Sequence, residues 1–274
     1  MDNAILKYKT LSKEVFGTPS DDPKAAFDES ILEKEIKTIV ANAVDGGQDP
    51  SSILKDEHPQ LCHTFVVATR LKAGAPVRMR SYGTQNDDAF EASIWQAGRA
   101  TSAAPTFFVP ITINDIRYGD GGMGWNNPSR EAILEARNKW PGRLIGILIS
   151  IGTGLEDALA LNDNSNAIPK VAKTLLKNTF GKHAFKLAVA EYAVRCVTSC
   201  ELVHRELSQD SGHDLLQGNY FRLNVPQGMS GIGLAEWDKL EDMVALTDAY
   251  MDHGEIKKKT RKIADLLQDP RRAG

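Results

Sequence analysis

The sequence predicts an α/β fold built around a mostly parallel sheet. Short apolar segments that are typical of strands alternate along the chain with segments of helical periodicity. The most apolar stretch, LIGILISI at residues 144–151, has the continuous hydrophobicity of a central strand buried on both faces. An acid, Asp120, stands in a glycine-rich turn between a predicted strand and a predicted helix. In α/β enzymes this is a common position for a catalytic group.

The first part of the chain is predicted to contain two helices and two strands. Apolar residues recur at three- and four-residue spacing over residues 4–16 and again over residues 30–44, which indicates two amphipathic helices. A polar loop at 45–60 follows. The β-branched run at 62–69 and the segment at 77–82 are then predicted to be strands, because a Gly-Ala-Pro turn separates them.

The middle of the chain surrounds the glycine turn. A helix rich in small residues is predicted over 94–102, ending before Pro105. An extended apolar segment at 107–113 leads towards the turn. The helix after the turn is predicted over 129–138, with Asn127 as its N-cap.

The remainder of the chain is predicted to be mainly helical. The expected segments are a polar linker at 155–168, helices over 169–208 broken near Gly181, a strand at 220–225, and helices over 235–251 and 255–268.

Composition excludes several classes of protein. The 274 residues suffice for one large α/β domain or two small ones, and the net charge of -3 argues against a nucleic-acid platform. Three cysteines without a pairing pattern indicate reduced thiols in the cytosol. No signal peptide is recognisable, and no apolar run approaches the roughly 20 residues of a membrane span. The protein is therefore predicted to be cytoplasmic, and peripheral contact with a membrane stays open.

Asp120 has two interpretations: a catalytic acid, or a turn residue that caps its own loop. The chain contains an internal control, because Asp45-Gly46-Gly47 repeats the same three letters. That copy follows a helix-like stretch and is predicted to end the helix. Asp120 instead follows a strand and precedes a capped helix, which is the context that a site requires.

A second glycine cluster, Gly152-Thr153-Gly154, follows the apolar strand. A dinucleotide fingerprint would need glycine at position 157, where the chain has Asp157, and a phosphate loop would need Gly-Lys-Ser/Thr. We therefore expect a tight turn at the carboxyl end of the sheet, close to Asp120, and no nucleotide cofactor.

Two further groupings have plain structural interpretations. Cys196, Cys200 and His204 share one helical face, but they lack a fourth ligand, so a core stripe is favoured over a metal site. The basic run at 257–262 is suited to anionic lipid, yet the apolar spacing that begins at Ile263 favours a solvated helix face. No metal is predicted.

Four segments in order resemble the patatin-like phospholipase family, most closely its fungal members. They are TFVVATR at 64–70, IWQAGRATSAAPTFFVPI at 94–111, YGDGGMGWNNPSREAI at 118–133 and LIGILISIGTG at 144–154, and NYFRLNVPQG at 219–228 also fits. The resemblance implies a partial patatin-like domain over residues 1–274, with its core motifs at 61–154 and a helical extension over about 169–274. The implied fold is a three-layer sandwich with a mostly parallel sheet, incomplete at the N-terminus.

The resemblance also implies a chemistry. Members of the family hydrolyse lipid esters, phospholipids or acylglycerols, through a Ser–Asp dyad without a cofactor. The aspartate takes the serine proton directly, and a glycine-rich loop supplies the oxyanion donors. Asp120 matches the family's aspartate, and Gly121 and Gly122 complete its Asp-Gly-Gly motif.

The chain departs from the family pattern at the nucleophile. No serine has glycine both two positions before and two positions after it; the nearest, in Gly228-Met229-Ser230-Gly231-Ile232, lacks the second glycine. The oxyanion-loop signature is also absent, and residues 1–17 resemble the segment just downstream of the nucleophile helix.

These departures lead to an expectation that the chain begins after the nucleophile elbow, through a gene-model error or a true deletion. It is then inactive alone, and an apolar sheet edge is exposed. The alternative is a non-catalytic pseudoenzyme, or a domain that binds lipid or a partner. Whether the chain is an enzyme, and its oligomeric state, stay open.

Overall fold

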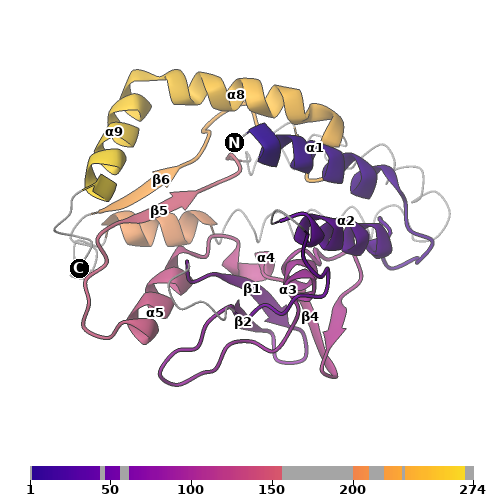
Figure 1. Cartoon of the computed structure of the whole chain (residues 1–274). Coiled ribbons are helices and arrows are strands. Elements are labelled where there is room, and N and C mark those ends of the chain that lie inside the picture. Colours follow the sequence, from indigo (N-terminus) through magenta and orange to yellow (C-terminus); the bar gives the residue numbers. More distant parts are fainter. Residues whose placement is uncertain are drawn as a thin grey trace. The chain divides into compact units, whose positions relative to one another are not determined.

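The computed structural model describes residues 2–43, 47–55, 62–155, 200–209, 219–229 and 232–268. The described residues fall into two compact units, the first ending at Asn126 and the second beginning at Asn127 (Figure 1). The predicted linker and most of the helices predicted over 169–208 lie outside the described residues, while residues 200–209 are helical as expected.

Three helices of the first unit confirm the helices that the sequence predicts there. They are α1 (Asp2–Gly17), α2 (Glu29–Ala41) and α3 (Ile94–Thr101). Local capping explains where two of them begin. The Asp28 side chain accepts from the Ser30 N–H at the start of α2, and Ser93 and Gln96 form a reciprocal capping box at the start of α3. In space, α2 packs against both α1 and α3.

The first unit contains a four-stranded sheet. Its strands are β1 (Phe65–Arg70), β2 (Ala75–Arg80), β3 (Ile111–Ile113) and β4 (Ile116–Asp120), in the order β2-β1-β4-β3. Every pairing in this sheet is antiparallel. The α/β class is therefore confirmed, whereas the predicted mostly parallel sheet is not.

Short connections account for the antiparallel order. Parallel neighbours need a crossover of a dozen or more residues, whereas β1 and β2 are joined by residues 71–74 alone. Between β3 and β4 only Asn114 and Asp115 intervene, with φ of 49° and 63°. Positive φ at both central residues is the hairpin geometry that Asn and Asp favour. The sequence signal lies at Asn114-Asp115, between the extended segment predicted at 107–113 and the strand predicted before Asp120.

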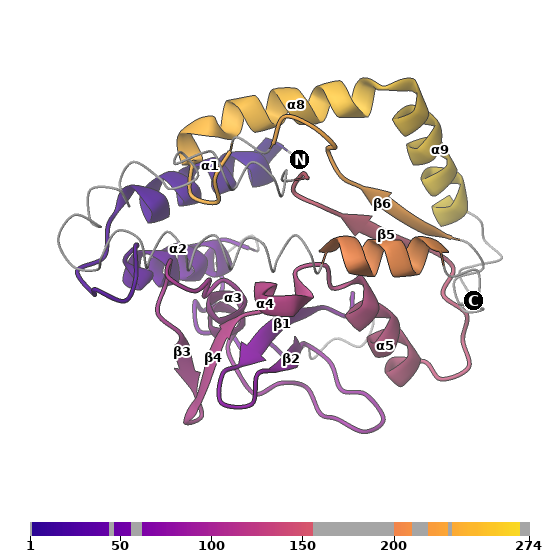
Figure 2. The same ribbon diagram turned by 180° about the vertical axis from the view of Figure 1, so that it is seen from behind.

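The core of the first unit lies between α3 and this sheet, which Figure 2 shows from behind. Small residues on α3 allow this close packing. The fully buried cluster comprises Ala68, Met79, Ala97, Ala100, Ile113 and Tyr118. One charged residue of α3 is also buried: Arg99, whose Nη2 donates to the Val109 carbonyl at 2.6 Å and whose Nε lies 3.6 Å from Glu33. Burial lowers the pKa of Arg99, and the nearby Glu33 and Glu29 oppose that shift.

The second unit combines helices with a two-stranded parallel sheet. Its elements are α5 (Ser129–Lys139), β5 (Leu148–Ile151), the helical residues 200–209, β6 (Tyr220–Leu223), the short 3₁₀ helix Trp237–Lys239, α8 (Leu240–Asp252) and α9 (Gly254–Gln268). Its core contains Ile133, Val203 and Leu207, packed beside Leu148 and Tyr220. Among the described residues of both units, no helix is both long enough and apolar enough to span a membrane.

The apolar stretch at 144–151 behaves differently from the prediction. Its strand begins only at Leu148, and β6 is its partner within the described residues. Leu144 is 57% exposed and Ile151 is 79% exposed, so the stretch is not covered on both faces.

Candidate active site

Asp120 lies at the last position of β4, partly buried and opposite Ala68 of β1. Its backbone is held by hydrogen bonds from two directions. The Asp120 N–H donates to the Ala103 carbonyl at 3.1 Å, and the Thr69 hydroxyl donates to the Asp120 carbonyl at 2.7 Å. Thr69 is buried in the folded protein, so its hydroxyl cannot reach water there. The bond to Asp120 replaces the bond to water that this hydroxyl makes in the unfolded chain. The acid therefore sits on a rigid part of the first unit.

The Asp120 side chain closes the glycine turn. Its Oδ1 accepts a hydrogen bond from the Gly122 N–H, at the start of the short helix α4 (Gly122–Trp125). The Trp125 N–H then donates to the Gly121 carbonyl at 2.9 Å. The structure thus contains the turn-capping bond that the sequence allowed, and this bond also fixes the orientation of the carboxylate. Capping and proton transfer are compatible roles for the same side chain.

Two positions in the turn require glycine, each for a different structural reason. A Cβ on Gly121 would lie 2.4 Å from the Val67 carbonyl oxygen, far inside van der Waals contact. That carbonyl is itself held by the Thr101 hydroxyl at 2.6 Å, so it cannot easily move. Gly124 has a φ of 145°, which side-chain-bearing residues rarely adopt. The turn is therefore tied to glycine by packing at one position and by backbone geometry at another.

Asn127, predicted as an N-cap, has a wider role in the second unit. The helix α5 begins at Ser129, as predicted, but Pro128 occupies the cap position that was predicted for Asn127. Asn127 Oδ1 accepts from the Ser129 N–H at 3.3 Å, the Ser129 hydroxyl at 2.7 Å and the Ser150 hydroxyl at 3.3 Å. Its Nδ2 donates to the Cys200 carbonyl at 3.3 Å. One buried amide therefore joins α5, β5 and the helix at 200–209.

The Gly152-Thr153-Gly154 segment serves close packing within the second unit. A Cβ on Gly152 would lie 2.3 Å from Asn224 Oδ1, and the Gly154 N–H donates to that same oxygen at 2.7 Å. Gly154 also has a φ of 109°. These contacts support the predicted tight turn. The expected proximity of this turn to Asp120 stays a prediction.

The structure describes two of the three residues in the cysteine and histidine grouping. Cys196 lies outside the described residues, and Cys200 contributes its carbonyl to Asn127. His204 Nδ1 lies 3.1 Å from the Ser208 hydroxyl and 3.3 Å from the Tyr220 hydroxyl. Burial lowers the pKa of His204, Glu201 opposes this shift, and Arg222 and Lys259 add to it. His204 thus belongs to a polar cluster that helical spacing alone did not reveal.

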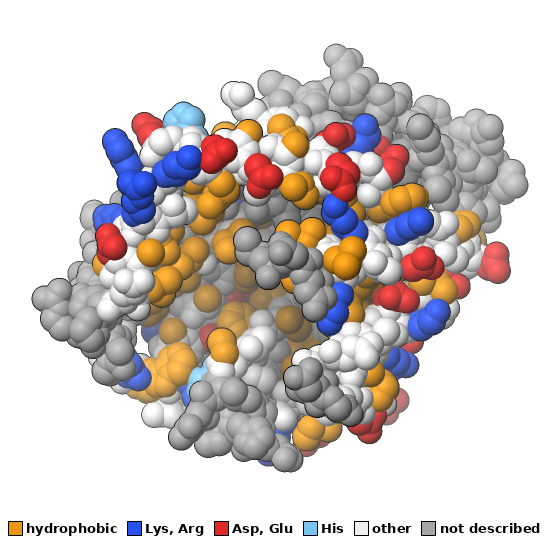
Figure 3. Space-filling view, turned by 45° about the horizontal axis from the view of Figure 1, so that its top comes forward, with side chains coloured by type: hydrophobic (Ala, Val, Ile, Leu, Met, Phe, Trp, Pro, Cys, Tyr) orange, Lys and Arg blue, Asp and Glu red, His pale blue; other side chains and the backbone are white. Residues whose placement is uncertain are grey.

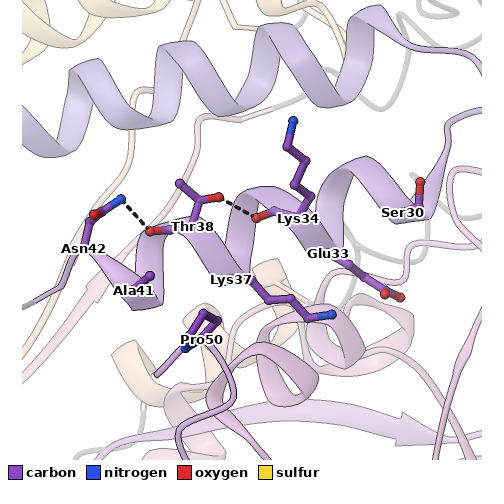
Figure 4. Close-up of a pocket in the computed structure, with 8 residues that line it drawn as sticks. All are labelled: Ser30, Glu33, Lys34, Lys37, Thr38, Ala41, Asn42 and Pro50. Carbon is purple, nitrogen blue, oxygen red and sulfur yellow. Dashed lines mark hydrogen bonds between the residues drawn. The ribbon is translucent and has the colours of Figure 1, made fainter. Parts of the chain in front are cut away.

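A groove of about 540 Å³ runs along α2, and Figure 4 shows its lining. The lining residues are Ser30, Glu33, Lys34, Lys37, Thr38, Ala41, Asn42 and Pro50. Two of its charged groups already have partners in the chain. Glu33 pairs with Arg99, and Lys37 Nζ lies 4.0 Å from the centre of the Trp95 ring. This groove contains no residue of the Asp120 motif, and we assign it no role.

Comparison with known proteins finds a family match that includes the Asp120 motif. The family model of the patatin-like phospholipases matches residues 9–133. Calcium-independent phospholipase A2-gamma from Rattus norvegicus is 26% identical over 285 residues, which cover 97% of this chain and 33% of that protein. The protein of the same name from Oryctolagus cuniculus is 31% identical over 176 residues, covering 64% and 19%. Phospholipase A I from Arabidopsis thaliana is 44% identical over 61 residues, covering 22% and 5%.

These matches support the patatin-like phospholipase family and homology to calcium-independent phospholipases A2. The chain spans at most a third of the length of these curated relatives.

Proposed function

We propose, from the patatin-like match over residues 9–133 and the homology to calcium-independent phospholipases A2, that this chain carries the acid half of a lipid acyl-hydrolase site. Asp120 is the proton acceptor, and Gly121 and Gly122 shape its turn. The substrate class is a phospholipid or a related lipid ester. The observation that carries the proposal is a strand-end acid whose backbone and carboxylate are both held in place.

In the proposed reaction, a serine oxygen attacks the ester carbonyl carbon while its proton passes to the Asp120 carboxylate. The carbon–oxygen bond to the lipid leaving group then breaks, and the proton is returned to that leaving oxygen. Water subsequently hydrolyses the acyl-serine. The bond from Gly122 suits Asp120 to this role, because a carboxylate with one oxygen anchored keeps its direction during proton transfer.

The printed residues contain no Gly-x-Ser-x-Gly elbow, and this observation favours a second candidate function. In that candidate the chain is a non-catalytic patatin-like domain that binds lipid or a protein partner. The two candidates agree that the chain by itself hydrolyses nothing, because a base without a nucleophile cannot form an acyl-enzyme. They differ in whether an elbow is supplied from outside the printed residues.

We propose that the protein acts in the cytoplasm, at or near membrane surfaces.

The first experiment therefore determines the full transcript. If it encodes an in-frame Gly-x-Ser-x-Gly segment upstream, the extended protein is assayed on a phospholipid and on a short-chain nitrophenyl ester. Asp120→Asn in the extended protein should lower turnover about 100-fold or more, as expected for the loss of a general base. Asp115→Asn is the matched control, since it removes an exposed carboxylate on the nearby β3–β4 turn.

Full activity of the extended Asp120→Asn protein would refute the assigned role of Asp120. A transcript without an upstream elbow would instead select the non-catalytic candidate. That candidate predicts that the purified chain binds phospholipid vesicles or a partner without cleaving ester.

A further inference from the structure

The second unit contains a groove of about 440 Å³ that the proposed hydrolase site does not use. It is formed by the helical residues 200–209, β6, α8 and α9, together with Leu155. The lining comprises Leu155, Glu201, His204, Ser208, Tyr220, Phe221, Arg222, Asn224, Pro226, Tyr250, Ile256 and Lys259. We call it the basic groove, because Glu201 is the one carboxylate among these residues while Arg222 and Lys259 are both cationic.

The two cations are held in place by bonds to the chain. Arg222 Nη1 donates to the Ser150 hydroxyl at 2.8 Å, and Ser150 in turn donates to Asn127. Lys259 Nζ lies 3.4 Å from the Arg222 carbonyl oxygen, which brings the ammonium onto β6. Among the described residues, neither cation forms an ion pair with a carboxylate. Pre-positioned cations bind an anion with less loss of side-chain entropy than mobile ones.

Arg222 also carries an unsatisfied donor. Its Nε is buried and has no hydrogen-bond partner among the described residues. A buried donor without an acceptor costs free energy, so such atoms are rare and each requires an explanation. A guanidinium presents several donors in one plane, and this geometry matches the oxygens of a phosphate or a carboxylate.

His204 adds an imidazole to the basic groove, and nearby charged side chains affect its pKa. When the Ser208 and Tyr220 hydroxyls both donate to Nδ1, the ring proton lies on Nε2. The imidazole is faced by Glu201 and Ser208 on its own helix, by Tyr220 and Arg222 on β6, and by Lys259 on α9. Arg222 and Lys259 disfavour a third positive charge at this point. A neutral His204 therefore leaves an electropositive groove with an additional N–H donor.

The other lining residues indicate which chemical group is attached to the bound anion. Tyr220, Phe221 and Tyr250 provide aromatic surface, and the Tyr250 hydroxyl accepts from the Asn224 N–H at 3.3 Å while keeping its own proton to donate. Lys262 Nζ lies 5.5 Å from the Phe221 ring centre, which adds positive potential beside the aromatic wall. In Figure 3, Lys and Arg side chains gather over α9, whereas Asp and Glu side chains line α8.

We propose that the basic groove binds a phosphate monoester carried on an apolar or aromatic group. Arg222 and Lys259 contact the phosphate oxygens, His204 donates from Nε2, and the tyrosine and phenylalanine rings contact the attached group. A phosphate is favoured over a carboxylate because its three terminal oxygens can be shared among three separate donors. The assignment does not depend on the proposed hydrolase function, since none of these residues belongs to the Asp120 motif.

The test is isothermal titration calorimetry of the whole chain at low ionic strength, with phenyl phosphate as the probe and inorganic phosphate for comparison. Saturable one-to-one binding of phenyl phosphate, tighter than that of inorganic phosphate, is expected. Lys259→Gln should weaken it about tenfold. Lys258→Gln is the matched control, because it removes the same charge from an exposed neighbouring position on α9 and should leave binding unchanged.

Arg222→Gln should weaken binding at least as much, and its folding is checked by circular dichroism because it also breaks the bond to Ser150. An independent measurement follows the His204 ring by NMR. Bound phosphate should raise the pKa of His204, since an adjacent anion favours the imidazolium. A structural role of these residues alone would not make that pKa depend on phenyl phosphate.

Sedimentation with phosphatidylcholine vesicles containing phosphatidic acid identifies the source of the phosphate. Vesicle binding that Lys259→Gln weakens more than Lys258→Gln supports a lipid head group, and binding of phenyl phosphate without vesicle binding supports a free phosphate monoester. The proposal fails if neither probe binds saturably, or if the two lysine variants weaken binding equally.

Discussion

At the scale of single residues, the glycine turn shows how packing determines sequence. Gly121 is required because the Val67 carbonyl occupies the position where a side chain would begin. That carbonyl is anchored by Thr101, and Asp120, next to Gly121, is anchored by Thr69. The acid and its glycine are therefore held by neighbours that lie far away in the sequence.

Gly121→Ala should destabilise the protein by about 1–3 kcal/mol, since the added Cβ cannot be accommodated without moving β1. The measurement is urea unfolding followed by circular dichroism. Gly17→Ala is the control, because a Cβ at that exposed position would meet nothing within 4 Å. Its free energy of unfolding should stay within about 0.5 kcal/mol of the parent. Equal effects of the two substitutions would contradict the packing explanation.

At the scale of elements, one hydrogen-bond network holds the second unit together. It runs from the Cys200 carbonyl through Asn127 to Ser150, and from there to Arg222. The network joins the helix at 200–209, the start of α5, β5 and β6. It also positions the guanidinium that lines the basic groove, so the groove depends on an amide in a different element.

Asn127→Asp tests this network with almost no change in shape. It replaces the Nδ2 donor by an oxygen, which then faces the Cys200 carbonyl with no proton to share. We expect a loss of about 1–3 kcal/mol in the free energy of unfolding at neutral pH. Asn86→Asp makes the same chemical change at an exposed loop position and should alter stability by no more than about 0.5 kcal/mol. A stability unchanged by Asn127→Asp would show that the buried amide is not needed as a donor.

At the scale of the whole molecule, His204 makes the stability of the protein depend on pH. Burial and the adjacent cations lower the pKa of His204 below its ordinary value of 6.5 in the folded protein. The unfolded chain therefore takes up a proton at a higher pH than the folded chain does. Stability is fully present above about 6.5 and is lost as the pH falls from there through the folded pKa.

His204→Gln should flatten the decline in thermal midpoint below pH 6.5 relative to the parent. The comparison uses unfolding temperatures measured by calorimetry between pH 7.5 and pH 5 at constant ionic strength. His253→Gln, at an exposed position, is the control and should retain the slope of the parent. If the slopes of parent and His204→Gln coincide, the folded state does not discriminate against the charged imidazole.

Much of the local structure could be predicted from the sequence. Amphipathic spacing located α1, α2 and α9 to within a few residues, because that spacing is a property of neighbouring positions. The strand–turn–helix context of Asp120 was also predicted correctly, since glycine and proline constrain the backbone directly. The family resemblance rested on the same short segments.

The direction and neighbours of the strands required the tertiary structure. Apolar runs such as 144–151 indicate burial in general but do not identify the partner strand or the covered face. The antiparallel sheet of the first unit includes two short turns, and the turn at Asn114-Asp115 was not predicted.

The sequence by itself determined that this protein is an α/β chain with an acid at a glycine turn, because those features are encoded within a few consecutive residues. Only the tertiary structure decided which side chains support that acid, and it alone brought His204, Arg222 and Lys259 around one groove. These residues are separated by tens of positions along the chain. Their proximity follows from strand pairing and helix packing, which no local pattern specifies.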